Sequence, residues 1–203
     1  PHANGQCANH FPIPLGQDFL AEILRDHGYG TAYFGKWHLD GGVKPGFVPP
    51  GERRLGFETF VGFNRGHFYD QSIYYRDTDQ PYHCPRHEPD FQTDHFIDYL
   101  DTRMKADKAE PFFAMVAYGP PHGPLIAPDH YLNLYSPEEM PIPDSVPQDD
   151  GFRGKTRKAL AEYYGLVANI DFNVGRILNA LDRHSLTDDT LILFMSDHGE
   201  MAG

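Results

Sequence analysis

A lysine and a histidine two positions apart, Lys36 and His38, follow a short segment with the pattern of a buried strand. The alternating run 31–34 predicts this strand, and Gly35 is expected to end it at a sharp turn. A lysine ammonium is a compact positive charge that binds anionic oxygens, and an imidazole accepts or donates protons near neutral pH. The pair therefore predicts a site that binds an anion and transfers a proton at the C-terminal end of a strand.

Two further apolar segments are followed directly by residues of the same kind. The run 112–118 precedes His122 in a proline-rich turn, and the run 191–195 precedes Asp197 and His198. Because ligands of open α/β sheets bind outside the carboxyl ends of the strands, we expect these clusters to converge on one crevice. Asp197 and His198 offer an oxygen and a nitrogen to a divalent cation. A single pair of this kind is commonly a solvated turn, but its repetition at three successive strand ends favours a site.

These clusters require strands that run in the same direction. Apolar residues spaced three and four apart predict helices over 15–27, 93–105 and 155–184, which alternate with the strands. Alternation of helices with fully apolar strands favours an α/β fold with a mostly parallel sheet flanked by helices. The longest helix is expected to bury one apolar stripe, which comprises Leu160, Tyr163, Tyr164, Val167, Ile170, Val174, Ile177, Leu178 and Leu181.

A long segment without regular periodicity, at about 40–90, interrupts this alternation. It is rich in glycine, proline and aromatic residues, and we expect an irregular excursion with short strands near 57–63 and 72–75. Loops of this length usually bind a ligand or form a lid. A second, proline-rich segment over 120–147 leaves room for no helix longer than a turn or two. Four residues of the excursion are candidates for a substrate pocket: Asn64, Arg65, His67 and Tyr69.

The composition excludes several classes of protein. Seventeen lysines and arginines stand against 29 acidic residues, a net charge of −12, and no basic stripe occurs, which argues against a nucleic-acid partner. Apolar residues at 40% and aromatic residues at 14% indicate a folded globular chain. No run of 18 apolar residues predicts a membrane span. Two cysteines, Cys7 and Cys84, are too few for a disulfide framework, and nothing in the sequence specifies an oligomeric state.

Four segments together resemble the sulfatase family. Residues 28–38 are similar to its second signature, which reads Gly-Tyr-x-Thr, three variable positions and then Gly-Lys-Trp-His. Residues 121–124 resemble the family's Pro-His-x-Pro motif, and residues 196–200 resemble its late metal-binding loop. Residues 1–5 are similar to the segment after its nucleophile helix. The resemblance covers essentially the whole chain, and it implies the alkaline-phosphatase-like α/β fold and an enzyme that hydrolyses sulfuric esters.

The resemblance also implies roles for five residues. Lys36 would contact the sulfate and the nucleophile, and His38 would take the proton that lets the sulfated intermediate eliminate sulfate. His122 would bind the sulfate and support departure of the leaving group. Asp197 and His198 would be two ligands of a divalent metal, most often calcium in this family. Many members have asparagine in place of His198, and because calcium prefers oxygen ligands, the histidine leaves Mg²⁺, Mn²⁺ or Zn²⁺ open.

The family's nucleophile is missing from the sequence. It is a formylglycine made from cysteine or serine in a Cys/Ser-x-Pro-x-Arg motif, and neither Cys7 nor Cys84 lies in such a motif. The early aspartate pair of the metal site and the late active-site lysine are missing as well. We therefore interpret residues 1–203 as the central part of a single sulfatase-type catalytic domain, incomplete at both ends, with the formylglycine upstream. This chain alone is expected to be inactive.

The expected substrate is a small-molecule or saccharide sulfate ester, and the resemblance is compatible with a periplasmic or secreted location. Two other functions stay open. A phosphonate monoester or phosphodiester hydrolase of the same superfamily shares the fold and often an Asp-His metal pair. A non-catalytic domain that binds an anion or a metal would keep the crevice without the nucleophile. Relative turnover of aryl sulfates and aryl phosphonates by the complete protein separates the two enzymes. Absence of the nucleophile motif from the full-length chain would favour the third function.

Overall fold

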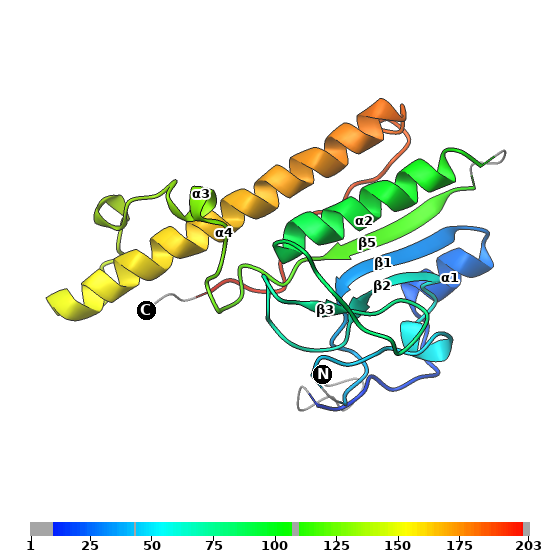
Figure 1. The fold of residues 1–203 in the computed structure, drawn as a ribbon, viewed down its shortest axis with the longest axis horizontal. Coiled ribbons are helices and arrows are strands. Elements are labelled where there is room, and N and C mark those ends of the chain that lie inside the picture. Colours follow the sequence, from blue (N-terminus) through cyan, green and yellow to red (C-terminus); the bar gives the residue numbers. More distant parts are fainter. Residues whose placement is uncertain (1–9, 43, 107–109, 201–203) are drawn as a thin grey trace. The chain divides into compact units, whose positions relative to one another are not determined.

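The computed structural model describes residues 10–42, 44–106 and 110–200, so Cys7 and the motif over 1–5 lie outside the described residues (Figure 1). The chain divides into two compact units between Gly119 and Pro120. The first unit contains the sheet together with the excursion, and the second contains the longest helix. Cys84, in the first unit, is a buried free thiol.

The first unit is built on a parallel sheet of three strands with the order β2-β1-β5 (Figure 1). The central strand β1 (Gly30–Lys36) pairs with β2 (Thr59–Phe63) on one side and with β5 (Phe112–Ala117) on the other. The mostly parallel sheet predicted from the apolar runs is therefore confirmed. All three strands end on the same side, so the residues that follow them are neighbours in space.

The sequence predicted that β1 ends at Gly35, but the strand continues to Lys36. The backbone of Gly35 has a φ of +125°, a conformation that favours glycine. A side chain at this position would overlap the carbonyl oxygen of Ala117 and lie 3.1 Å from the Nε2 atom of Gln92. Gly35 therefore allows β1 and β5 to approach closely where the sheet ends.

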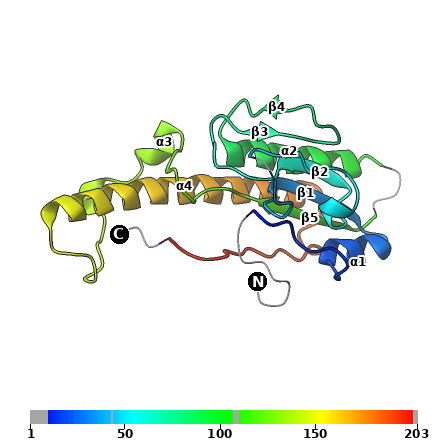
Figure 2. The ribbon, with the colours of Figure 1, turned by 90° about the horizontal axis from the view of Figure 1, so that it is seen from below.

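Two helices cover the sheet of the first unit, α1 (Leu20–Asp26) and α2 (Glu88–Arg103). They lie on opposite faces of the sheet (Figure 2). The predicted helix over 15–27 is shorter than expected, and the one over 93–105 begins five residues earlier, at Glu88. A proline in the first turn of α2 is tolerated because the first amides of a helix have no partner within it.

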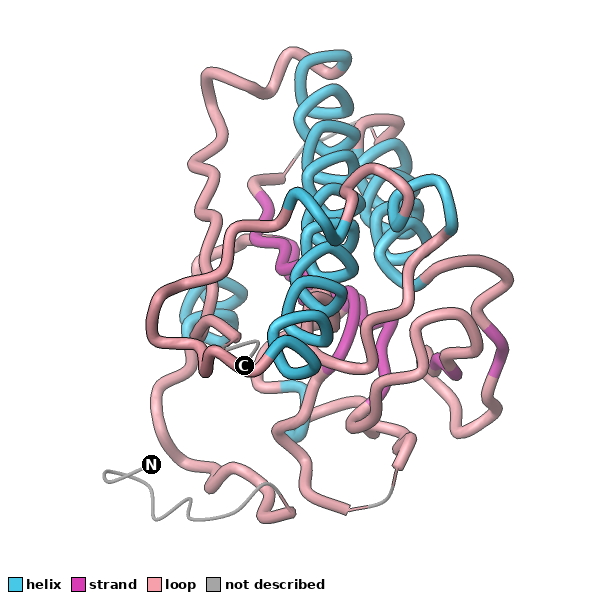
Figure 3. Tube along the Cα trace, turned by 90° about the vertical axis from the view of Figure 1, so that its left-hand side faces the viewer, coloured by secondary structure: helices cyan, strands magenta, loops and turns pink. Residues whose placement is uncertain are grey.

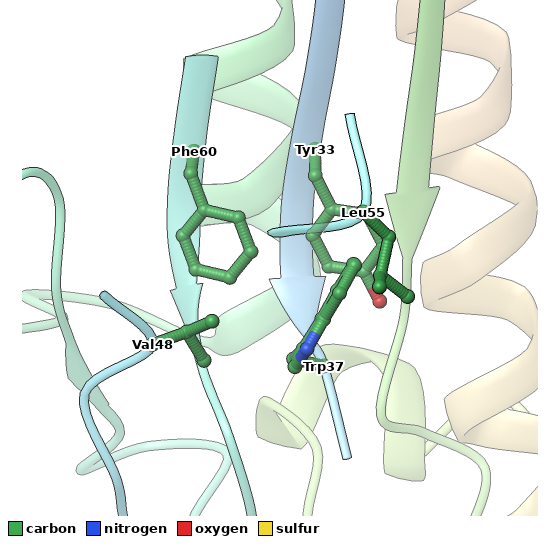
Figure 4. Packing of buried hydrophobic residues seen from close by; sticks show 5 residues of the cluster. All are labelled: Tyr33, Trp37, Val48, Leu55 and Phe60. Atoms are coloured by element: carbon green, nitrogen blue, oxygen red, sulfur yellow. The ribbon is translucent and has the colours of Figure 1, made fainter. Parts of the chain in front are cut away.

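Successive residues of β1 pack on opposite faces of the sheet. Phe34 contacts Phe96 of α2 with a ring-centroid distance of 6.2 Å, whereas Tyr33 and Phe60 stack at 5.5 Å on the other face. This is the alternation expected of a strand that is covered on both faces. The cluster around Tyr33 consists of five buried side chains, Tyr33, Trp37, Val48, Leu55 and Phe60 (Figure 4).

Apart from β2, the excursion over about 40–90 is mostly loop (Figure 3), with a short antiparallel pair formed by β3 (Ile73–Tyr74) and β4 (Tyr82–His83). The two predicted strands are present as β2 and β3, and β4 was not predicted. Arg54, at the end of the 3-10 turn Glu52–Arg54, fixes this segment from within. Its guanidinium is buried, donates to the carbonyl oxygen of Val48 and forms an ion pair of 2.9 Å with Asp77.

The second unit consists of α3 (Asp129–Leu132), the 3-10 turn Pro137–Glu139 and α4 (Asp150–Arg183). The proline-rich segment has only these two short turns, as predicted. Helix α4 begins five residues before the predicted start because the Asp149 side chain accepts a hydrogen bond of 2.8 Å from the Phe152 amide. No helix in the described parts of the chain is long and apolar enough to cross a membrane.

The predicted apolar stripe of α4 is only partly buried. Tyr164, Val167 and Leu178 are about two-fifths exposed, whereas Leu166 is fully buried against a cluster with Ala127 and Tyr131. The buried face of α4 is therefore turned relative to the predicted stripe, which does not contain Leu166. Gly165 and Asn169, which it left out, are buried.

The strand predicted over 191–195 is not formed in the described structure. Leu191, Leu193 and Phe194 are 96%, 77% and 72% exposed, and no ladder includes them. A β-ladder needs the backbone groups of a neighbouring strand. An apolar run predicts that a segment is buried, but it does not specify which strand it pairs with.

Candidate active site

Lys36 is held at the end of the central strand by contacts on both sides of its backbone. Its carbonyl oxygen accepts a hydrogen bond from the Tyr33 hydroxyl. The amide of the next residue, Trp37, donates to the carbonyl oxygen of Phe63 at 2.8 Å. Trp37 itself is buried in the aromatic cluster next to the sheet (Figure 4). The point from which the lysine side chain leaves the backbone is therefore fixed.

The Lys36 side chain meets a histidine of the excursion. Its Nζ atom lies 3.0 Å from Nε2 of His67, and Nδ1 of His67 lies 3.1 Å from the hydroxyl of Tyr69. An ammonium group can only donate, so Nε2 must accept. The remaining proton of the neutral imidazole then resides on Nδ1, which donates to the Tyr69 hydroxyl. The hydrogen-bond partners thus assign the tautomer of His67.

A buried carboxyl group, Glu88, lies next to this chain of contacts. Its oxygens accept hydrogen bonds from the Ser72 hydroxyl and from Nε2 of Gln92, the latter at 3.0 Å. Burial raises the pKa of Glu88 to about 7. The two hydrogen bonds and the positive charge of Lys36 act in the opposite direction and favour the ionised form. Glu88 is therefore a carboxyl group that titrates near neutral pH in the interior of the first unit.

Tyr69 connects His67 to the start of α2 and the end of β5. The Glu88 amide donates to the Tyr69 carbonyl oxygen at 2.7 Å, and the tyrosine side chain is fully buried. A Cβ atom on Gly119 would lie 2.9 Å from Cε1 of Tyr69 and 2.8 Å from Oε1 of Glu88. Glycine at position 119 thus leaves the space that these two side chains occupy. Burial raises the pKa of Tyr69, with a smaller effect in the same direction from Glu88, so the phenol keeps its proton.

His38 lies just beyond β1 in a left-handed backbone conformation, with a φ of +56°. Its amide donates to the carbonyl oxygen of Asn64 at 2.5 Å. The buried amide side chain of Asn64 in turn accepts from the Asp40 amide at 3.2 Å and donates to the carbonyl oxygen of Gly41. The excursion therefore fixes the backbone around His38 as well as the ammonium of Lys36.

The three other predicted site residues belong to the second unit. His122 is exposed, and its Nδ1 atom lies 2.7 Å from the carbonyl oxygen of Gly123. The side chains of Asp197 and His198 are 89% and 72% exposed, with 3.6 Å between carboxylate oxygen and Nε2. Two effects raise the pKa of His198. The larger is the hydrogen bond from its ring to the Gly199 carbonyl oxygen, and the smaller is the negative charge of Asp197. Convergence of these residues with Lys36 and His38 stays a prediction.

The chemistry of Asp197 and His198 fits two ligand positions of a divalent metal, one oxygen and one nitrogen. Among the residues that the structure describes, no group of three or more His, Cys, Asp or Glu side chains is arranged to hold a metal ion. The role of Asp197 and His198 as metal ligands stays a prediction.

His67 and Tyr69 are candidates for a substrate pocket by sequence, whereas their buried neighbours Ser72, Glu88 and Gln92 carry no signal in the sequence. Glu88 opens a helix, where an acidic residue usually complements the helix dipole at the surface. Nothing in the local pattern distinguishes it from such a residue. Its burial comes from contacts with segments far away in the sequence.

The parallel sheet flanked by helices places the chain in the class of α/β proteins with an alkaline-phosphatase-like fold. The solved structure of the Bacteroides fragilis protein yidJ, a sulfatase candidate, superimposes with a TM-score of 0.76 at 26% sequence identity, over 87% of this chain and 42% of that one. The sulfatase family matches residues 1–203, and the chain belongs to this family.

Two curated relatives support the assignment. The ulvan-active sulfatase of Formosa agariphila is 34% identical over 206 residues, which cover 100% of this chain and 39% of the relative. The arylsulfatase of Clostridium perfringens is 33% identical over 134 residues, which cover 58% of this chain and 27% of the relative. The chain thus spans less than half the length of these relatives.

Proposed function

We propose that the complete protein containing this chain hydrolyses sulfuric esters and that Lys36 binds an oxygen of the sulfate group. The observation that carries the proposal is the position of Lys36. Its ammonium lies at the carboxyl end of the central parallel strand and contacts His67 at 3.0 Å, in a chain that belongs to the sulfatase family. A positive charge fixed before the substrate arrives stabilises the negative charge that develops in the transition state.

Two histidines would move the protons. We assign to His38 the removal of the proton that allows the sulfated intermediate to release sulfate. We assign to His122 the binding of sulfate and the protonation of the departing alcohol oxygen, which its exposed position in the second unit permits. The nucleophile, a formylglycine, would come from outside residues 1–203, which we interpret as the central part of one catalytic domain.

Asp197 and His198 would provide two ligands of a divalent metal. When bound, such a metal adds positive charge next to the sulfate oxygens. Calcium is the metal most often found in the family, and the imidazole nitrogen of His198 also suits Mg²⁺, Mn²⁺ or Zn²⁺. The carboxylate of Asp197 suits any of these ions.

We propose a saccharide sulfate ester as the first substrate to test, because the name of the Formosa agariphila relative states activity on ulvan. The experiment compares the complete protein on 4-nitrophenyl sulfate, on ulvan and on a 4-nitrophenyl phosphonate ester. Release of inorganic sulfate from either of the first two supports the proposal. Turnover of the phosphonate ester alone would contradict it and identify a phosphorus hydrolase.

A further inference from the structure

We propose that His67 is a positioning residue for Lys36 in the reaction proposed above, on which this inference rests. Its Nε2 atom accepts a hydrogen bond from the lysine ammonium, and its Nδ1 atom donates to the buried hydroxyl of Tyr69. In this way His67 fixes the direction in which the ammonium presents its remaining protons to a sulfate group.

A lysine side chain needs such support because its four-carbon stem rotates freely and its charge has no preferred direction. Holding it in one rotamer costs conformational entropy, which a substrate would otherwise have to supply on binding. The hydrogen bond to His67 orders the side chain before the substrate arrives. Lys36 is only partly buried, so packing alone does not hold the ammonium.

His67 can position Lys36 only if it is itself fixed, and the structure shows what fixes it. Its partner Tyr69 is fully buried, and the Tyr69 backbone is held by the Glu88 amide at 2.7 Å. The absence of a side chain at Gly119 makes room for the tyrosine ring at the end of β5. The chain of contacts from the ammonium therefore ends on the first residue of α2.

An imidazole is better suited to this task than a carboxylate. A carboxylate at the same distance would fix the ammonium but also compensate its charge, and so weaken the attraction for a sulfate oxygen. A neutral imidazole accepts the same hydrogen bond and adds no negative charge of its own next to the ammonium. Among the residues that the structure describes, the one buried carboxyl group is Glu88, which accepts hydrogen bonds from Ser72 and Gln92 and interacts with Lys36 through its charge.

The test uses two substitutions in the complete protein that each keep one half of the imidazole. In His67→Gln the amide oxygen reaches the position of Nε2 and can still accept from Lys36, whereas in His67→Asn the amide occupies the position of Nδ1 and faces Tyr69. We expect His67→Asn to lower kcat/KM for 4-nitrophenyl sulfate about tenfold or more, and His67→Gln to lower it by about threefold. The matched pair His83→Gln and His83→Asn, at an exposed position of β4, controls for the loss of a histidine.

Equal losses in the two His67 variants, or a larger loss in His67→Gln, would overturn the proposal. Thermal melting of both variants shows whether either has simply lost its fold. If either variant has lost its fold, the proposal is tested instead by measuring the tautomer of His67 in the wild-type protein.

Nitrogen-15 NMR of the histidine-labelled complete protein reports this tautomer without any substrate. The signal of His67 is assigned by its absence in either His67 variant. A neutral ring with the proton on Nδ1 supports the proposal, whereas a proton on Nε2, or on both nitrogens, would overturn it. If the wild-type protein shows the predicted tautomer but hydrolyses no sulfate ester, the proposed function fails and the contact between His67 and Lys36 stands.

Discussion

Lys36 and His67 are 31 positions apart in the sequence, yet their side-chain nitrogens lie 3.0 Å apart. Lys36 ends the central strand, and His67 comes from the loop after the neighbouring strand β2. Their contact joins the motif that defines the family signature to the excursion, which has no regular pattern. The excursion thus supplies a hydrogen-bond partner to the Lys36 ammonium.

The space left by Gly119 predicts the effect of adding a methyl group there. We expect Gly119→Ala to destabilise the complete protein by roughly 1–3 kcal/mol, because the new Cβ atom would crowd Glu88 and Tyr69. Urea unfolding measures the change. Gly154→Ala, on the exposed side of α4 with no atom within 4 Å, is the control and is expected to be neutral or slightly stabilising. Equal effects of the two substitutions would show that the space at Gly119 is not needed.

Glu88 predicts a pH dependence of stability. Its pKa is raised from 4.5 to about 7 in the folded protein, so between these values the folded state binds more protons than the unfolded state. The contribution of Glu88 to stability therefore falls by at most about 3 kcal/mol as pH rises from 4.5 to 7. Above pH 7 this contribution is constant. In Glu88→Gln this loss is absent, so the free energy of unfolding of the variant should rise relative to wild type over this range.

Urea unfolding at pH 5, 6, 7 and 8 measures that difference. Glu52→Gln, at an exposed position, is the matched control and should follow the wild-type protein at every pH. A difference between Glu88→Gln and wild type that does not change between pH 5 and 7 would contradict the raised pKa of Glu88.

The buried guanidinium of Arg54 predicts how strongly the excursion depends on one residue. Arg54→Met removes hydrogen bonds to the carbonyl oxygens of Val48 and Arg76. Val48 belongs to the buried cluster around Tyr33. We expect a loss of about 2–4 kcal/mol in the free energy of unfolding, since hydrogen bonds to a charged group contribute more than neutral ones. Arg25→Met, which breaks an exposed ion pair with Asp26, should cost less than about 1 kcal/mol. Similar costs for both variants would show that Arg54 is not a structural centre of the excursion.

The proposed metal ligands predict a change in ion preference. Removal of divalent ions with a chelator should abolish sulfate-ester turnover by the complete protein, and adding them back should restore it. His198→Asn replaces a nitrogen ligand by an amide oxygen, so we expect the variant to respond more strongly to calcium relative to Mn²⁺ or Zn²⁺ than the wild type does. The activity restored by each ion in both proteins measures the preference, and an unchanged ranking would argue against His198 as a ligand.

The sequence predicted the parts of the structure that depend on local patterns. Strand β1 could be predicted because its alternating apolar run is short and local, and α4 could be predicted from its repeated apolar spacing. Glu88 could not be recognised, because a buried acid at a helix start has the same local pattern as an exposed one. The segment 191–195 was misread for a related reason, since its composition does not specify a neighbouring strand.

The central claim is that Lys36 binds the sulfate group of an ester substrate. Initial rates of sulfate release by the complete wild-type protein and by its Lys36→Met variant test it most directly, with Lys44→Met, an exposed lysine of the same unit, as the control. We expect Lys36→Met to lower kcat/KM by on the order of 10²–10³ while Lys44→Met retains the wild-type value. A Lys36→Met protein that is folded and turns over the ester at the wild-type rate would contradict the claim.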